Sequence, residues 1–123
     1  MASFNTIGNY LSADRTSRNE QLIIRLHQIV RDNFTDFDFS LAAAAQILGM
    51  NASYISHIFK KQTGESFVDY LNQIRIEHAC SLLKGTEEPI TNVATQSGFF
   101  SAGYFSRIFK KIIGCTPGQY RSI

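Results

Sequence analysis

Residues 54–61 read YISHIFKK and residues 104–111 read YFSRIFKK, so six of the eight aligned positions are identical at an offset of 50. A glycine follows each stretch at the same offset, Gly64 after the first and Gly114 after the second. Such repetition is typical of a duplicated supersecondary unit. We therefore interpret the rest of the chain outward from these two stretches.

Upstream of the two stretches the repeat continues, but its offset changes to 49. The aligned pairs are Leu41 with Ile90, Ala45 with Ala94, and Gly49 with Gly98. The second copy therefore has one extra residue between Gly98 and Tyr104. We place this residue in a turn, because loops tolerate insertions that helices do not.

In each copy a short helix ends at a glycine, and a few turn residues lead to a longer helix with its own N-cap. The expected elements are helices 41–48 and 52–63, capped by Ser40 and Asn51, and helices 90–97 and 102–113, the latter capped by Ser101. This order is the helix-turn-helix motif. The small side chains of Ala45 and Ala94 allow the two helices of each motif to approach closely.

The longer helix of each copy has one apolar side and one polar side. The apolar sides comprise Ile55, Ile58 and Phe59, and Phe105, Ile108 and Phe109. The outward sides comprise Ser53, Ser56, His57 and Lys60, and Gly103, Ser106, Arg107 and Lys110. Long polar side chains on the second helix of such a motif suit the major groove of duplex DNA.

The chemistry of the outward residues divides them into two groups. We expect Arg107 to contact a guanine edge and Ser53, Ser56 and His57 to donate or accept single hydrogen bonds to bases. The basic pairs Lys60-Lys61 and Lys110-Lys111 lie toward the helix C-termini and are candidates for phosphate contacts. The alternative is a duplicated helical hairpin whose polar face is only solvated.

The whole chain reads as all-α, with about seven helices and no strand pattern. The expected division is a linker or disordered lead-in at 1–18, a first helix-turn-helix subdomain at 19–66, a linker helix at 67–84, and a second subdomain at 85–123. The first helix is expected at 21–34 with Asn19 as its cap, and Pro89 in the first turn of the fifth helix. A linker helix over 67–83 is about 26 Å long. Once the packing of a helix-turn-helix unit at each end is added, the two recognition helices can lie about 34 Å apart, which is one turn of DNA.

Bulk composition limits the class of protein. With 44% hydrophobic and 18% charged residues, the 123-residue chain can form a packed core. The net charge is only +2, but residues 40–123 hold eight basic and five acidic side chains against four and five in residues 1–39. With only two cysteines and no disulfide framework, a reduced, cytoplasmic protein is the simplest interpretation. No apolar run reaches membrane-spanning length, and no signal peptide is evident.

At this point the chain resembles the AraC/XylS family of bacterial transcription regulators over roughly residues 22–122. The matching motifs are Ser40-Leu41, Gly49-Met50, residues 53–61, Gly64 and Ser66-Phe67 in the first unit; Tyr70-Leu71, Arg75-Ile76, Ala79 and Leu82-Leu83 in the linker; and Ile90, Val93-Ala94, Gly98-Phe99, residues 104–107 and 109–111, Gly114, Thr116-Pro117 and Tyr120-Arg121 in the second unit. Together these motifs are highly specific.

The resemblance implies a seven-helix domain that binds promoter DNA through recognition helices at about 52–63 and 102–113. It implies base contacts from Ala52, Ser53, Ser56 and His57, and from Ala102, Gly103, Ser106 and Arg107. Ser40, Lys60, Lys61, Lys110, Lys111 and Arg121 complete the expected site as phosphate contacts. Family members regulate transcription and usually carry a sensory or receiver domain, so RNA polymerase and such a domain are expected partners, and the chain is expected to be the output piece of a larger regulator.

The chain departs from the family pattern at several positions. The family often has Arg where His57 stands, and polar residues where Phe100, Ala102 and Gly103 stand. We therefore expect the second helix to rely on Arg107 and on DNA shape for specificity.

Some residues have a structural and a functional interpretation. Arg75 is expected to pair with acidic neighbours near Asp69 or Glu77, with a phosphate contact as the alternative, and Arg121 to contact a phosphate or form a salt bridge. The Phe-rich set is expected in the core, except that Phe100 can be exposed in the turn as a small partner-contact patch. The core set is Phe59, Phe67, Phe99, Phe105 and Phe109.

No metal or cofactor site is expected. The spacing of Cys80 and Cys115 matches no metal-binding signature, and Cys80 reads as a small core residue. The three histidines fall on different predicted helices.

Two other classes of protein are weaker alternatives. A protein-interaction module would have apolar residues in place of the outward lysines and Arg107. An enzyme fragment would show a nucleophile with its base, a phosphate loop or paired carboxylates, and we find none of these patterns.

Overall fold

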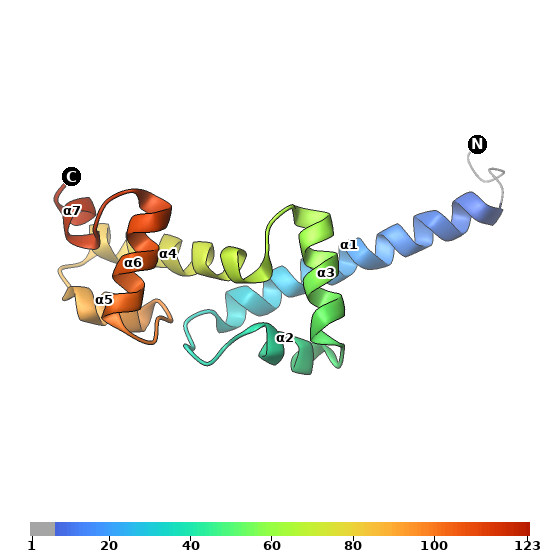
Figure 1. Cartoon of the computed structure of the whole chain (residues 1–123), viewed down its shortest axis with the longest axis horizontal. Coiled ribbons are helices and arrows are strands. Elements are labelled where there is room, and N and C mark those ends of the chain that lie inside the picture. Colours follow the sequence, from blue (N-terminus) through green and yellow to red (C-terminus); the bar gives the residue numbers. More distant parts are fainter. Residues whose placement is uncertain (1–6) are drawn as a thin grey trace.

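The computed structural model describes residues 7–123, with side chains from residue 17 onward, and these residues form helices and connecting loops only (Figure 1). In chain order the helices are α1 (Ile7–Asn33), α2 (Leu41–Leu48), α3 (Ala52–Thr63), α4 (Phe67–Gly85), α5 (Ile90–Gln96), α6 (Ala102–Ile113) and α7 (Pro117–Ser122). The all-α class and the seven helices are confirmed. Both helix-turn-helix units are connected through α4.

Local capping explains where most of these helices begin and end. Ser40 Oγ accepts from the Ala43 amide at 3.3 Å, Asn51 Oδ1 from the Tyr54 amide at 3.0 Å, and Ser101 Oγ from the Tyr104 amide at 3.1 Å. These are the three N-caps that the sequence predicts. Three of the predicted stop glycines, Gly49, Gly64 and Gly114, adopt the left-handed conformation at the ends of α2, α3 and α6.

Several helix ends differ from the prediction. α1 begins at Ile7 rather than near Asn19, so residues 7–18 of the expected lead-in are helical, and residues 1–6 lie outside the described part. Residues 9–18 contain no glycine or proline, and extending an existing helix costs far less than starting one. α4 continues through Gly85, and Pro89 is the N-cap of α5 rather than part of its first turn.

The apolar residues form two cores that meet along α4. Phe67 and Leu71 belong to the first core, with Ile55 and Phe59 of α3. The second core holds Ile76, Ala79 and Leu83 of α4, packed with α5 and α6. The predicted Phe-rich core set is confirmed, since every member is at most 2% exposed. Both cores therefore share α4, a helix of 19 residues that is about 28 Å long and has one helix-turn-helix unit packed toward each end.

Arg75 is structural, as expected, but its predicted partners are wrong. Its guanidinium donates to the backbone carbonyls of Phe34, Asp36 and Phe39 in the loop between α1 and α2, rather than to Asp69 or Glu77 on its own helix. The reason is burial: Arg75 lies on the side of α4 that this loop covers, and only 7% of it is exposed.

Candidate nucleic-acid interface

The two candidate recognition helices are displayed in the same way at different places along α4. In Figure 1, α3 and α6 run in the same direction and begin at the same edge of the molecule; α6 crosses α4, whereas α3 lies beside the N-terminal end of α4. Each helix is anchored by its apolar side: Ile55 and Phe59 of α3, and Phe105 and Phe109 of α6, are fully buried. The opposite side of each helix is consequently turned outward.

The predicted base-reading residues all lie on these outward sides. Ser53 and His57 of α3, and Gly103 and Arg107 of α6, are exposed. The half-buried members are Ala52 and Ser56 in α3, and Ala102 and Ser106 in α6. Residues at i, i+3 and i+4 share a helix face, so each set forms one continuous surface at the N-terminal half of its helix. That half is the part of a recognition helix that contacts base edges.

An aromatic ring supports Arg107, which the sequence reasoning missed. The Arg107 guanidinium carbon lies 5.2 Å from the centre of the Tyr104 ring, within the range of a cation–π contact. Tyr104 is itself held at 6.0 Å, ring centre to ring centre, from the buried Phe99. The spacing i, i+3 in the stretch YFSR is the signal that could have predicted this contact.

The lysine pairs are exposed in the last turns of α3 and α6. Cations at a helix C-terminus also stabilise the helix through its dipole, so their position has a structural advantage beside any contact with phosphate. Lys60 and Lys110 continue the faces of His57 and Arg107, because each follows at i+3.

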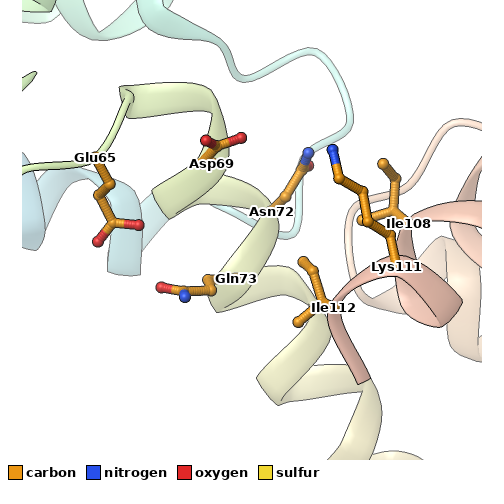
Figure 2. Close-up of a pocket in the computed structure, with 7 residues that line it drawn as sticks. All are labelled: Glu65, Asp69, Asn72, Gln73, Ile108, Lys111 and Ile112. Carbon is orange, nitrogen blue, oxygen red and sulfur yellow. The ribbon is translucent and has the colours of Figure 1, made fainter. Parts of the chain in front are cut away.

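Lys111 is exposed on the side of α6 that faces α4. It lines a cleft of about 280 Å³ between α4 and α6, whose other lining residues are Glu65, Asp69, Asn72, Gln73, Ile108 and Ile112. In Figure 2 its side chain points toward Asn72. Ile108, predicted in the buried stripe, is half-buried here at the rim of the second core.

Ser40 and Arg121 have structural contacts. Ser40 is exposed, and its hydroxyl caps α2. Arg121 Nε donates to the Leu83 carbonyl at 3.0 Å, and its Nη2 is buried without a hydrogen-bond partner in the described residues. Arg121 thereby connects α7 to the end of α4.

The histidines and cysteines do not form a second polar site. His27 packs against the rings of Phe59 and Tyr70, and His78 against Phe34. Burial raises the pKa of the Cys80 thiol above its usual value, which favours the protonated form. Within residues 7–123, no group of three or more His, Cys, Asp or Glu could hold a metal ion. No helix in that part of the chain is long and apolar enough to cross a membrane.

Comparison with known proteins places this arrangement in a family. A family model described as a helix-turn-helix domain matches residues 44–123. The arabinose operon regulatory protein of Escherichia coli (strain K12) is 37% identical over 95 residues, which cover 77% of this chain and 32% of that protein.

Two solved structures have the same fold. The C-terminal domain of AraT, a response regulator from Geobacillus stearothermophilus, has a TM-score of 0.80 and 37% identity, covering 82% of this chain and 84% of that chain. The DNA-binding domain of AdpA, a global transcriptional factor in complex with a target DNA, has a TM-score of 0.75 at 21% identity, covering 81% of this chain and 89% of that chain.

The helices and their exposed faces define a double helix-turn-helix domain. More particularly, the chain belongs to the AraC/XylS family of transcription regulators. It spans about a third of the length of the first curated relatives it matches.

Proposed function

We propose that this protein binds duplex promoter DNA sequence-specifically and regulates transcription, with α3 and α6 in two successive major grooves. The observation that carries the proposal is the pair of repeat-related helices. They run in the same direction, are connected through α4, and expose matched polar and basic faces. A solvated surface alone does not require that the same face be displayed twice. The likeness to the arabinose operon regulatory protein supports the regulatory role.

We assign base contacts to Ala52, Ser53, Ser56 and His57 in α3, and to Ala102, Gly103, Ser106 and Arg107 in α6. Lys60, Lys61, Lys110, Lys111 and Ser40 are assigned to phosphates flanking the two grooves. Arg107 is the strongest base-reading group of this set, because a guanidinium can donate two parallel hydrogen bonds to guanine and the Tyr104 ring restricts its motion. The first helix has only short side chains and His57, so we expect a weaker sequence preference there.

We further propose that the chain is the output part of a larger regulator acting in the cytoplasm, that a sensory or receiver domain controls it, and that it contacts RNA polymerase at promoters. The basis is that it corresponds to about a third of its regulatory relatives. We assign it no enzymatic activity, in line with the family to which it belongs.

Selection of the protein on randomised duplex DNA tests the proposal. We expect enrichment of two short sequence blocks centred about 10 base pairs apart, one helical turn. Enrichment of a single block would mean that only one helix reads sequence. Neither enrichment nor salt-sensitive retention of DNA would reject DNA binding altogether and favour a protein-interaction module.

A further inference from the structure

The loop between α1 and α2 connects the two helix-turn-helix units directly. Arg75 Nε donates to the Phe34 carbonyl at 2.8 Å, and its Nη2 donates to the carbonyls of Asp36 at 2.9 Å and Phe39 at 3.3 Å. Arg75 belongs to the middle of α4, and its bonds span 36 to 41 residues of sequence. A buried guanidinium satisfied by three carbonyls holds the loop in one place, because each broken bond would leave a buried polar group unpaired.

Gly98, in the turn of the second unit, packs against the same loop. A Cβ at this position would collide with the Phe34 carbonyl oxygen and lie 2.8 Å from Arg75 Nε. Gly49, its counterpart in the first unit, also has positive φ, but a Cβ there would meet nothing within 4 Å. Two features therefore require glycine at position 98: the positive φ and the close approach of the loop between α1 and α2. At position 49 only the positive φ favours glycine.

An exposed pair of aromatic rings continues this contact. The ring centres of Phe37, in the loop, and Phe100, in the turn of the second unit, are 5.5 Å apart. Phe100 lies in the part of the turn that the repeat lengthens by one residue relative to the first unit. The single insertion in the repeat thus falls where the second unit meets the first. We name this contact the junction, comprising Phe34, Phe37, Arg75, Gly98 and Phe100.

We propose that Arg75 is a positioning residue, which acts through the junction to fix the orientation of α6 relative to α3 and so sets the spacing of DNA half-sites that the protein accepts. This rests on the proposed function. Among the described residues the two cores share only α4, and a single helix between two bodies can bend or twist. A second, lateral contact removes that freedom. Two rigidly joined binding units gain affinity from each other only on duplexes whose spacing matches their geometry.

The first test measures spacing selectivity. Binding is titrated on duplexes that carry both selected blocks at separations varied one base pair at a time, and on duplexes with one block. Wild-type protein is expected to show a sharp optimum. Arg75→Met should bind single-block duplexes as wild type does, lose about tenfold at the optimal spacing, and show a flattened profile.

The glycines supply a matched pair of variants. Gly98→Ala should flatten the spacing profile, whereas Gly49→Ala, also at positive φ but with open space around its Cβ, should lower thermal stability and leave the profile sharp. Phe100→Ala, at an exposed position, keeps the test available if Arg75→Met fails to fold. The proposal would be overturned if Gly98→Ala and Arg75→Met fold and still show a sharp dependence of affinity on spacing. If neither variant folds, a sharp dependence in Phe100→Ala would overturn it.

A measurement without DNA separates this proposal from the proposed function. Residual dipolar couplings of amides in the two units should fit one alignment tensor in the wild-type protein and two different tensors in Arg75→Met. Two tensors in the wild type would overturn the junction's role even if DNA binding holds. One tensor in the wild type together with no DNA binding would instead reject the proposed function.

Discussion

At the scale of single residues, Arg107 combines exposure, charge and support. It lies on the outward face of α6 beside Gly103 and Ser106, where few other side chains can read a base edge. The Tyr104 ring beneath it limits its rotamers, so less conformational entropy is lost when the guanidinium meets a base. Its counterpart in α3 is His57, which lacks the two parallel donors of arginine.

Arg107→Ala should weaken binding to the preferred site by about 1–3 kcal/mol and relax specificity at one base position. Titration of the variant on the selected duplex and on duplexes substituted at each position measures both effects. Arg107→Lys keeps the charge but not the paired donors, so it should lose specificity with a smaller loss of affinity. Equal losses of affinity on preferred and random DNA would instead identify Arg107 as a phosphate contact.

The Tyr104 ring should act through Arg107. A double-mutant cycle of Tyr104→Ala and Arg107→Ala, measured as binding free energy on the preferred duplex, is expected to show a coupling of about 0.5–1 kcal/mol, the size of an exposed cation–π contact. Tyr54→Ala is the matched control. Tyr54 aligns with Tyr104 in the repeat, but the residue three positions after it is His57 rather than an arginine. Additive effects of the two substitutions would contradict the positioning role of Tyr104.

At the scale of elements, each recognition helix is specified by signals within a few residues of its ends. Asn51 and Ser101 accept from the amides of Tyr54 and Tyr104, and the glycine after each helix ends it in the left-handed conformation. The amphipathic pattern then orients the helix by burying Phe59 or Phe109. These caps keep the start of each helix ordered, which matters because the proposed base-reading residues lie in the first two turns.

Loss of a cap should therefore destabilise the protein and weaken DNA binding together. Ser101→Ala is expected to lower the free energy of unfolding by about 1 kcal/mol, since the Tyr104 amide loses its acceptor. Chemical denaturation measures this loss. Ser101→Asp, which retains an acceptor, is the control and should keep most of the stability. A Ser101→Ala variant as stable as the wild type would show that the cap contributes nothing measurable.

At the scale of the whole molecule, the charges matter through their distribution. The net charge of +2 is small, yet four of the five lysines lie in the last turns of α3 and α6. The fifth, Lys84, is engaged elsewhere: its Nζ donates to the Ile123 carbonyl at 2.9 Å and lies 5.0 Å from the centre of the Tyr120 ring. DNA binding should therefore depend on the lysine pairs and not on Lys84.

The salt dependence of binding tests this distribution. If all four paired lysines contact phosphates, the slope of log affinity against log salt should be about −3.6. Substitution of Lys60 or Lys110 by glutamine should reduce the magnitude of the slope by about 0.9. Lys84→Gln is the control and should leave it unchanged. A slope equally sensitive to Lys84 and Lys110 would point to a diffuse charge effect rather than to specific phosphate contacts.

The features of this protein depend on interactions of two kinds: those between residues close in sequence and those between residues far apart in sequence. The repeat, the caps Ser40, Asn51 and Ser101 and the two-sided pattern of α3 and α6 were readable from the sequence, because capping and amphipathicity depend on residues a few positions apart. The family resemblance was readable for the same reason, since its motifs follow these elements.

Only the tertiary structure decided which hydrogen-bond partners Arg75 and Arg121 find and why a side chain at position 98 would collide with its neighbours. Arg75 reaches carbonyls 36 to 41 residues away, and Arg121 reaches the Leu83 carbonyl across 38 residues. A backbone carbonyl is present at every position, so no residue type in the sequence marks the one that an arginine will meet. The relative orientation of the two recognition helices depends on such long-range hydrogen bonds. It therefore could not be predicted from the sequence and required the tertiary structure.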